Sequence, residues 1–473
     1  MKIDLPYKVE KIIGIIKDAG FEAFAVGGCV RDFLLGRVPN DWDITTDALP
    51  KDIKRIFKRT VDTGIAHGTV TVLMGKEGFE VTTYRVDGKY SDGRHPDRVE
   101  FTRSLEEDLK RRDFTINSFA YNPEKGLVDL FDGMSDLENH IIRAVGKPEE
   151  RFGEDALRIL RAFRFSAQLD FRVEEKTKEA AKELSGNLSM ISAERIREEL
   201  TKLITSDHPE RMEDLYDNGI TEIILPELDK CMEEVQNNPH HIYTVGRHSI
   251  KAMTFITREN LRRFADVLPD LDKNEAEYIR SLRYTMLFHD MGKPECRTVD
   301  GDNINHYYGH ALTGEEKTRN ILKRLKSDNN SIRTITALVK YHDYRPELTE
   351  KSVRKAVNRI GEDIFPLLFP VRYADIMAQS SHKQTEKLRK EEEILTLYRD
   401  IIRKKQCLSL KDLSVDGGIL IKEAGMKPGR ELGEMLQYLL QRVLEEPSWN
   451  EREKLLKVAK EKLEQENTKN VTE

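Results

Sequence analysis

The fold of the N-terminal part is decided by the stretch GGCVRDFLLGRVPNDWDIT, residues 27–45 of the chain. An apolar run at 21–26 precedes it and indicates a buried strand, so Gly27 and Gly28 are expected to form the turn from this strand into a helix. Such a turn exposes backbone N–H groups at the positive end of a helix, where a phosphate group can bind. Taken alone this is a weak signal, because most Gly-Gly turns only redirect the chain.

The segment DWDIT, residues 41–45, brings two carboxylates together. Alternate side chains of a strand point to one face, so Asp41 and Asp43 share a face while Trp42 and Ile44 point into a core. Like charges so placed repel unless a cation lies between them, and Mg²⁺ prefers carboxylate oxygens and substrate phosphates as ligands. Two-metal nucleotidyl transfer requires this arrangement. A bare DxD is usually a solvated turn, but a DxD on an apolar strand soon after a Gly-Gly turn is much less often so.

Further along, the chain changes from mixed to helical character. Strand patterns at 69–74 and 79–84 are joined by a glycine-containing hairpin, which could bring Glu80 beside the DxD strand as a third metal-binding carboxylate. Beyond residue 152 apolar residues recur with helical periodicity almost to the end. The predicted fold class is therefore an α/β head followed by a mostly α-helical remainder.

Composition limits the class of protein. The chain has 473 residues, 38% hydrophobic and 34% charged, with a formal net charge of −6, which describes a strongly solvated multidomain protein. No apolar run approaches the roughly 20 residues of a membrane-spanning helix, and the N-terminus lacks the pattern of a secretion signal. We therefore expect no membrane partner and a cytoplasmic location. The four cysteines form no CxxC pair, so neither disulfides nor a thiolate zinc site is expected.

At this point the residues resemble a known family. The stretch at 27–44 is similar to the signature of class II CCA-adding tRNA nucleotidyltransferases and bacterial poly(A) polymerases, members of the polymerase-β nucleotidyltransferase superfamily. The resemblance continues in order over roughly residues 20–205 and rests on five segments: GGCVRDFLLGRVPNDWDI, RRDFTINSFAY, LVDLFDGMSDL, EDALRILRAFRF and ISAERIREEL.

The resemblance implies a polymerase-β-like head and a set of site residues. Asp41 and Asp43 would be the catalytic ligands of Mg²⁺. The residues that would bind the incoming nucleotide are Gly27, Gly28, Arg31, Asp32, Arg112, Asp113, Asp155, Arg158 and Arg161. Without the resemblance, the Arg-Arg-Asp cluster at 111–113 would be read as a solvated charge cluster.

The EDALR segment carries the most specific expectation. Asp155 and Arg158 are three residues apart in a helical pattern and would share one face, with Arg161 one turn further. A carboxylate acceptor beside guanidinium donors can pair with the Watson–Crick edge of C or A. The resemblance implies that this protein template selects CTP and ATP; the alternative is a surface ion pair of little energetic value.

Two further expectations concern addition of the complete CCA end. The polar stretch at 84–104 resembles the flexible loop of enzymes that complete all of C-C-A, and Arg85 and Asp87 are its candidate residues. Basic residues of the C-terminal part offer contacts for a tRNA acceptor arm and elbow. A poly(A) polymerase, or a CC-adding or A-adding partner enzyme, remains the alternative within the family.

A second group of residues suggests another metal site. The spacing of histidines and aspartates from 248 to 375 resembles that of HD-type metal-dependent phosphohydrolases, in which imidazoles and carboxylates bind a transition metal. The candidate ligands are His248, His289, Asp290, His310, His342 and Asp375. An HD phosphohydrolase with an RNA-binding head is thus the alternative from a different class.

These patterns divide the chain into five segments. They are a nucleotidyltransferase head at 1–145, a nucleotide-selecting helical neck at 146–206, an HD-like helical body at 207–380, a tRNA-binding helical tail at 381–460 and a disordered end at 461–473.

Overall fold

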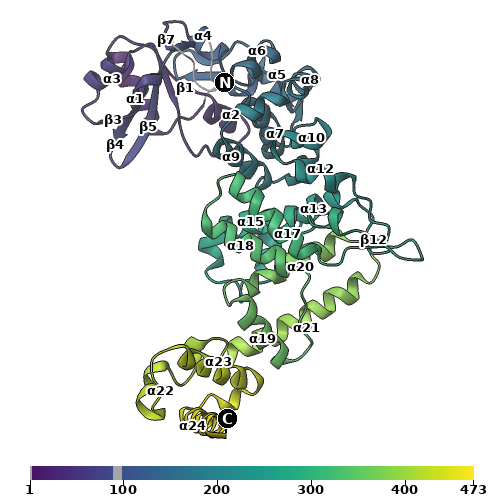
Figure 1. Cartoon of the computed structure of the whole chain (residues 1–473). Helices are drawn as coiled ribbons and strands as arrows, with labels where there is room; N and C mark the ends of the chain where they lie inside the picture. Colours follow the sequence, from purple (N-terminus) through teal and green to yellow (C-terminus); the bar gives the residue numbers. More distant parts are fainter. Residues whose placement is uncertain (1–2, 89–98, 473) are drawn as a thin grey trace. The chain divides into compact units, whose positions relative to one another are not determined.

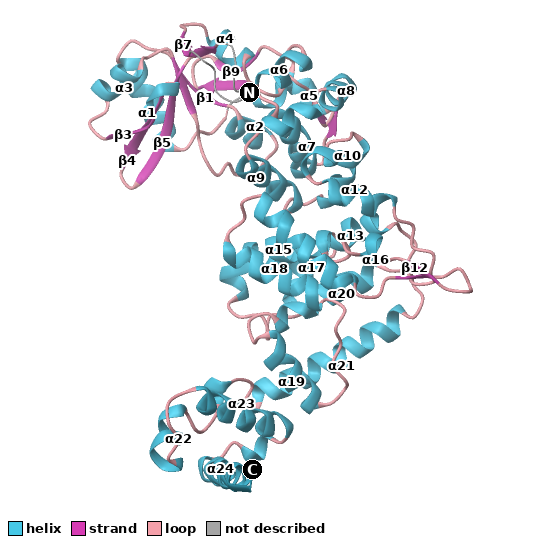
Figure 2. Cartoon of the chain, viewed as in Figure 1, coloured by secondary structure: helices cyan, strands magenta, loops and turns pink. Residues whose placement is uncertain are grey.

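The computed structural model describes residues 3–88 and 99–472. Its internal contacts divide the chain into two compact units, the first made of 1–229 with 324–327 and the second of 230–323 with 328–473. Figure 1 follows the chain through both units, and Figure 2 shows strands gathered in the N-terminal part and helices over most of the remainder. The predicted fold class, an α/β head followed by a mostly helical region, is confirmed.

The head is built on one mixed sheet with the strand order β3-β4-β5-β2-β1-β8-β9. Strand β2 pairs parallel with β5 and antiparallel with β1, so the segment after the DxD motif lies at the centre of the sheet. The strands are β1 (Ala23–Val26), β2 (Ile44–Thr46), β3 (Thr60–Gly64), β4 (Thr69–Met74), β5 (Glu77–Thr83), β8 (Phe119–Asn122) and β9 (Gly126–Asp129).

Four of these strands were expected from the sequence and three were not. The patterns at 21–26, 41–45, 69–74 and 79–84 correspond to β1, β2, β4 and β5, and β4 and β5 form the predicted hairpin. Strands β8 and β9 overlap the second and third motifs, in which the sequence patterns did not indicate strands. Small two-stranded sheets are formed by β6 (Arg85–Asp87) with β7 (Val99–Phe101) and by β10 (Ile141–Ile142) with β11 (Arg172–Val173).

Helix α1 illustrates how the head obtains its core. Val9, Ile12, Ile13 and Ile16 are buried, at the i, i+3, i+4 and i+7 spacing of one helical face. The helices from the head to the end of the first unit are α1 (Tyr7–Asp18), α2 (Gly28–Leu34), α3 (Pro50–Ile56), α4 (Leu105–Lys110), α5 (Gly133–Glu138), α6 (Pro148–Glu154), α7 (Leu157–Leu169), α8 (Glu175–Glu183), α9 (Ala193–Ile204), α10 (Met212–Asp217), α11 (Thr221–Ile224) and α12 (Pro226–Glu233).

The second unit is helical apart from the hairpin of β12 (Thr298–Val299) and β13 (Asn305–His306). Helices α13 and α20 pack against α15, which also contacts α18. The helices are α13 (Val245–Met253), α14 (Arg258–Arg262), α15 (Leu271–Phe288), α16 (Lys293–Cys296), α17 (His310–Arg324), α18 (Asn329–Tyr341), α19 (Glu350–Ile360), α20 (Leu368–Ala378), α21 (Gln384–Arg403), α22 (Gly417–Ala424), α23 (Arg430–Glu445) and α24 (Arg452–Thr472).

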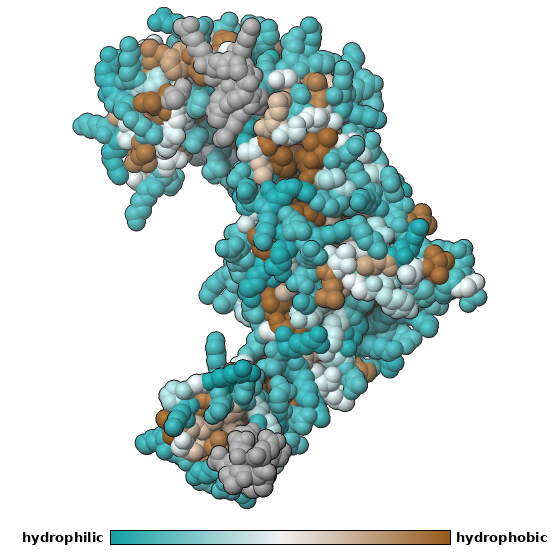
Figure 3. All heavy atoms as spheres, in the orientation of Figure 1, coloured by the Kyte–Doolittle hydropathy of each residue, from teal (hydrophilic) through white to brown (hydrophobic). Residues whose placement is uncertain are grey.

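The hydrophilic surface agrees with the high content of charged residues in the sequence. The face in Figure 3 is mostly hydrophilic, with hydrophobic residues in small separate groups. The C-terminal helices have a core of their own, to which Leu420, Leu439 and Leu455 contribute fully buried side chains. Among the described residues, no helix is both long and apolar enough to cross a membrane.

Candidate active site and a candidate metal centre

The Gly-Gly turn forms as predicted and lies against an arginine of the second motif. Gly27 has φ +83°, a conformation that favours glycine, and directly precedes α2. A Cβ added at Gly27 would lie 2.9 Å from Nη1 of Arg112, so the guanidinium occupies the space that a side chain would fill. Arg31, which is buried, donates to Asn117 Oδ1 at 2.5 Å and to Asp32 Oδ1. Asp32 is thus the carboxylate that pairs with Arg31 in this structure.

The DxD carboxylates line a cavity of about 860 Å³ in the head. Asp41, Asp43 and Glu80 all contribute to its wall, because the parallel pairing of Ile44 with Val81 brings Glu80 beside the DxD segment. The hairpin thus places the third carboxylate where the sequence suggested. The ligand oxygens of the three are not gathered within 4.8 Å of one another, a spacing that acidic and histidine groups of the described residues reach only in the second unit.

One detail of the DxD prediction is wrong. Strand β2 begins at Ile44, so Asp41 and Asp43 precede the strand and do not lie on it. Both aspartates are exposed at the cavity and Trp42 is half-buried, not part of a core. The carbonyl of Asp43 accepts the backbone N–H of Val26 at 3.0 Å, and the two carboxylates lie in the segment that leads into β2.

The electrostatics of this cavity favour a bound cation. Surrounding protein atoms raise the pKa of the Asp43 carboxyl, Arg112 opposes this effect, and the charges of Glu80 and Asp41 add to it. A carboxylate whose charge is disfavoured by two neighbouring carboxylates is stabilised by a metal ion between them. Three oxygen donors of this kind match the preference of a hard divalent ion.

The side chain of Asp113 is buried and held by neighbouring side chains. It is 8% exposed, and its carboxylate accepts from Nη2 of Arg161 at 2.6 Å and from Nδ2 of Asn117 at 3.0 Å. Asn117 in turn holds Arg31. Asp113 therefore connects the arginine after the Gly-Gly turn with the arginine of the fourth motif.

The sequence predicted that Asp155 and Arg158 share one helix face, and this prediction is wrong. Helix α6 ends at Glu154 and α7 begins at Leu157, with Asp155 in extended conformation between them. The helix is interrupted here because the Asp155 carboxylate accepts the backbone N–H of Leu157 at 3.0 Å. This hydrogen bond competes with continuation of the helix. The same carboxylate accepts from Nη2 of Arg195 at 2.8 Å, and Arg195 belongs to the fifth motif.

Arg158 is 9% exposed, and its guanidinium is held by hydrogen bonds. It donates to Glu154 Oε2 at 2.6 Å and to the carbonyls of Arg151 and Arg111, both at 3.1 Å. Three of its five N–H groups are thus used, which leaves two donors with no partner among the described residues.

Sequence reasoning did not single out Asp108, Asn117 and Arg195, and Asp108 is the most deeply buried of the three. Asp108 is fully buried at the end of α4 and accepts from Nη2 of Arg111 at 2.6 Å and from Oγ1 of Thr45 at 3.2 Å; Nη2 of Arg112 lies 3.4 Å from it. Burial would raise its pKa, but Arg111 and Arg112 lower it. The signal was present as an aspartate three and four residues before two arginines.

The expected flexible loop is described only at its ends. Arg85 begins β6, its guanidinium donates to the His67 carbonyl at 2.6 Å, and its backbone N–H approaches Asp108 at 3.4 Å. Asp87 ends β6 and pairs with Val99 of β7. The side chain of Asp87 and residues 89–98 lie outside the described part of the structure.

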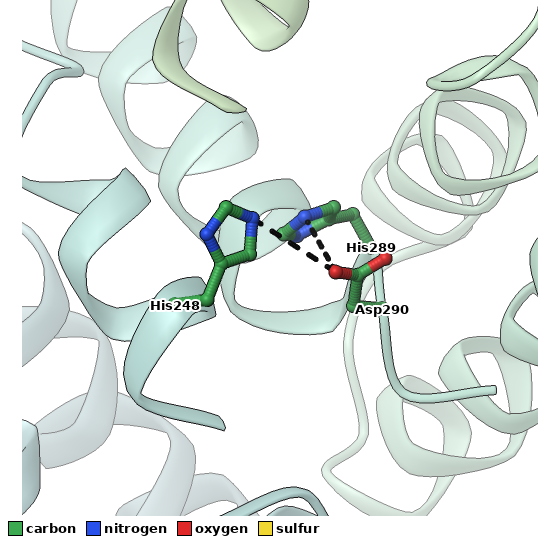
Figure 4. A group of neighbouring side chains, drawn as sticks. All are labelled: His248, His289 and Asp290. Carbon is green, nitrogen blue, oxygen red and sulfur yellow. Dashed lines mark ion pairs between the residues drawn. The ribbon is translucent and has the colours of Figure 1, made fainter. Parts of the chain in front are cut away.

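All six histidines and aspartates predicted for a second site come together in the second unit. His248 lies on α13, His289 and Asp290 follow α15, and His310 begins α17. His342 follows α18, and Asp375 lies on α20. The ligand atoms of five of them form two groups, each within 4.8 Å: His248, His289 and Asp290, and Asp290, His310 and His342. Figure 4 shows the imidazoles of His248 and His289 directed toward the Asp290 carboxylate.

The distances in this cluster are short and centre on Asp290. Nε2 of His289 lies 3.3 Å from its carboxylate, and Nε2 of His310 lies 3.5 Å from it. Asp375 accepts from Nε2 of His248 at 2.9 Å and lies 3.7 Å from Nε2 of His289. Nδ1 of His289 and of His342 each contact a backbone carbonyl at 2.7 Å, which orients their Nε2 atoms toward the cluster.

The burial of His289 and Asp290 and the contacts of their polar atoms test whether this cluster fits a metal ion. His289 and Asp290 are each 1% exposed, and Nε2 of His289 has no hydrogen-bond partner among the described residues. One carboxylate oxygen of Asp290 forms an ion pair with Nζ of Lys293 at 2.7 Å. Burial would lower the pKa of His289, but Asp290 and Asp375 raise it to about 10. A buried imidazole nitrogen without a partner is costly, and a metal ion bound by His289 and Asp290 would satisfy it.

Comparison with family models covers most of the chain. The model described as poly A polymerase head domain matches residues 23–143, and the probable RNA and SrmB-binding site of polymerase A matches residues 170–232. A putative tRNA nucleotidyltransferase domain 2 matches residues 310–459.

Relatives and solved structures agree with these models. The CCA-adding enzyme of Streptococcus suis strain 05ZYH33 is 34% identical over 98% of this chain and 100% of the relative. That of Pediococcus pentosaceus is 39% identical over 74% of this chain and 96% of the relative. The crystal structure of the Bacillus stearothermophilus CCA-adding enzyme in complex with CTP is 26% identical, has a TM-score of 0.69, and covers 98% of this chain and 100% of that chain.

Proposed function

The chain belongs to the family of CCA-adding enzymes, and we propose from this membership how its residues perform the reaction. The protein is a tRNA nucleotidyltransferase that adds C, C and A to the tRNA 3′ end from CTP and ATP without a nucleic-acid template. The observation that carries this conclusion is 34% identity to a CCA-adding enzyme along 98% of the chain. Its partners are therefore tRNA, CTP and ATP.

Asp41 and Asp43, with Glu80, would hold Mg²⁺ at the head cavity. The donor set fits, because three carboxylates line one cavity and their charges disfavour the ionised form of Asp43. Bound Mg²⁺ supplies the charge that activates the attacking 3′-hydroxyl and steadies the leaving pyrophosphate. The tRNA 3′-hydroxyl loses its proton to solvent and its oxygen forms a bond to the α-phosphorus, while the bond from that phosphorus to the oxygen that bridges to the β-phosphate breaks and pyrophosphate departs with that oxygen.

The Gly-Gly turn and the arginines around it would receive the triphosphate. Gly27 and Gly28 offer backbone without side chains, and Arg112 lies directly over the turn. Arg31 is oriented by Asn117 and by Asp32. Arg161 and Asp113, which pair with each other, would keep these arginines in place and would not need to contact the nucleotide.

Asp155 and Arg158 would select the base. Asp155 uses its carboxylate on Arg195 and Leu157 but retains lone pairs, so it can accept from the exocyclic amino group of C or A. Arg158 has two remaining donors for ring acceptors. Arg85 and Asp87 at the ends of the loop would support the change from C to A addition, and the helical tail would grip the tRNA elbow by shape.

The test is incubation of the purified protein with a tRNA that lacks its last three nucleotides, Mg²⁺, and CTP and ATP separately and together. Ordered addition of C, C and A that then stops is the expected result. An untemplated A tail would establish the poly(A) polymerase alternative, and addition of only CC or only A would establish the partner-enzyme alternative.

A second candidate function is favoured by the cluster around Asp290, which we propose is the metal centre of an HD-type phosphohydrolase. His248, His289, Asp290 and Asp375 would hold one transition metal ion, and Asp290, His310 and His342 would hold a second. Such ions supply a water of lowered pKa for hydrolysis of a phosphate ester. The buried ligand atoms without hydrogen-bond partners support this assignment.

Metal content tests this second function independently of nucleotide addition. The full-length protein should retain a transition metal after gel filtration, and His289→Ala with Asp290→Ala should lose it. Addition of C and A to tRNA should persist in these variants, because the DxD carboxylates belong to the other unit. Equal metal content in wild type and variants would refute the centre.

A further inference from the structure

A cavity of about 640 Å³ opens onto the proposed metal centre of the second unit, and the inference below rests on that centre. Asp290, His310, His342 and Asp375 contribute to its wall. The remaining wall includes the end of the β12–β13 hairpin and the segment from it to α17. A volume of this size is typical of small-molecule sites.

The segment from the hairpin to α17 is tied to the metal centre. The backbone carbonyl of Tyr307 contacts Nδ1 of His310 at 2.8 Å, so the same short segment orients a candidate metal ligand. The Tyr307 hydroxyl donates to Glu234 at 3.1 Å, and the ammonium of Lys293 lies 5.4 Å from the centre of its ring. Because Tyr308 is only two residues from His310, it is held within about 7 Å of that ligand's backbone.

Tyr308 is an unusual residue of this wall. It lines the cavity but is 79% exposed. Its ring stacks on that of His306 with centroids 5.6 Å apart and an interplanar angle of 6°, and Nε2 of His306 is held by Asp300 at 2.8 Å. One face of the tyrosine is therefore supported by a fixed imidazole. Leu312, 61% exposed, adds a second apolar side chain to the same wall.

From this arrangement we infer that His306 and Tyr308 form a stacking platform for the base of a nucleotide whose phosphate reaches the metal centre. A flat aromatic ligand can stack on the open face of Tyr308, and stacking of this kind tolerates different bases. The phosphate of such a ligand would lie where imidazoles and carboxylates converge. The ligand is thus a nucleoside phosphate, either free or at the end of an RNA chain.

The experiment compares AMP with ligands that lack the base. Full-length protein loaded with metal is titrated calorimetrically with AMP, ribose 5-phosphate and inorganic phosphate. Tyr308→Ala should weaken AMP binding at this site about tenfold without changing ribose 5-phosphate binding, since stacking on one aromatic ring contributes about that factor. Tyr308→Phe should retain AMP binding because it keeps the ring.

The matched control is Val299→Ala. Val299 lies on β12 of the same hairpin and is 53% exposed, but it does not line the cavity, so AMP binding should stay unchanged. Because the head is also proposed to bind nucleotides, the isotherms are fitted with two sites, and the affinity of the site that depends on added transition metal is compared between variants. An unchanged ratio of AMP to ribose 5-phosphate affinity in Tyr308→Ala would overturn the platform.

Two further measurements separate the remaining outcomes. Metal content should be equal in wild type and Tyr308→Ala; a wild type without metal would refute the metal centre, while a base-dependent difference in AMP binding would still support the platform. An RNA oligomer with a terminal phosphate, titrated in parallel, identifies the source of the nucleotide. A loss of RNA binding in Tyr308→Ala as large as the loss of AMP binding indicates an RNA end, and RNA binding that does not change in this variant indicates a free nucleotide.

Discussion

Arg195 of the fifth motif donates from Nη2 to the carboxylate of Asp155 in the fourth motif at 2.8 Å. The two residues come from different helical segments of the first unit, with Asp155 between α6 and α7 and Arg195 on α9. A carboxylate at a helix break can rotate freely unless a second group holds it. The orientation of the proposed base-reading group therefore depends on a residue that need not contact the nucleotide.

Asp155→Ala should relax the choice of CTP and ATP over UTP and GTP, because it removes the acceptor for the amino group of C or A. We expect about tenfold or greater loss of discrimination, the usual effect of one specific hydrogen bond to a buried site. Arg195→Ala should cause a smaller loss in the same direction. The measurement is incorporation of each nucleotide in competition. Unchanged selectivity in Asp155→Ala would exclude it from base selection.

Asp41→Ala and Asp43→Ala should each reduce nucleotide transfer about a thousandfold or more, because each removes a ligand of the catalytic ion. Binding of tRNA, measured by filter retention, should change little. Asp47→Ala serves as a control, since Asp47 follows the same strand but does not line the cavity. Near-normal transfer by either catalytic-site variant would disprove the metal assignment.

Asp108→Asn should destabilise the head and raise the KM for both nucleotides. The substitution leaves Arg111 and Arg112 beside a neutral amide in a buried position, which costs about 3 kcal/mol. Because Arg112 lies over the Gly-Gly turn, loss of its partner should weaken nucleotide binding more than tRNA binding. Thermal unfolding and initial rates test both effects. Glu106→Gln, an exposed position on the same helix, should be neutral.

The pair of Asp113 and Arg161 should make the first unit sensitive to acid. Burial would raise the pKa of Asp113, but Arg161 and Asn117 hold it well below its usual value. A lowered folded-state pKa stabilises the fold above the unfolded value of about 4, and this contribution is lost as the pH falls through the folded pKa. Asp113→Asn should therefore show a smaller decline of unfolding free energy below about pH 4 than wild type. Identical pH profiles would count against the pair.

Removal of metal should destabilise the second unit. Dialysis against a chelator that is then removed should lower the thermal midpoint of wild type, because it leaves the buried groups around Asp290 without ligands. Readdition of a transition metal should restore the midpoint, whereas Mg²⁺ alone should not. His342→Ala should reduce the effect of the chelator. If treatment with the chelator leaves the thermal midpoint of wild type unchanged, bound metal has no structural role.

The sequence predicted the head through local patterns. The strand-turn-helix around Gly27 and the β4–β5 hairpin depend on turn glycines and alternation over a few residues, and both formed as expected. The histidines and aspartates of the second unit were also identified by order and spacing. Their convergence was anticipated because this order resembles that of HD-type phosphohydrolases.

What the sequence could not predict depends on contacts between distant segments. The burial of Asp108 requires Thr45 and Arg85 from other strands. The helix break at Asp155 results from competition between helix continuation and the Asx-type bond to Leu157, which propensity alone does not decide. The platform of His306 and Tyr308 depends on ring orientation, for which periodicity carries no signal.

The close approach of Arg112 to Gly27 also limits how this site can change during evolution. Any side chain at position 27 meets two separate obstacles, a left-handed backbone and a guanidinium 2.9 Å from its Cβ. A shorter residue at position 112 relieves only the second obstacle and removes a proposed phosphate contact. No single suppressor mutation at position 112 can therefore restore function to a Gly27→Ala variant, and the two positions are expected to remain fixed together.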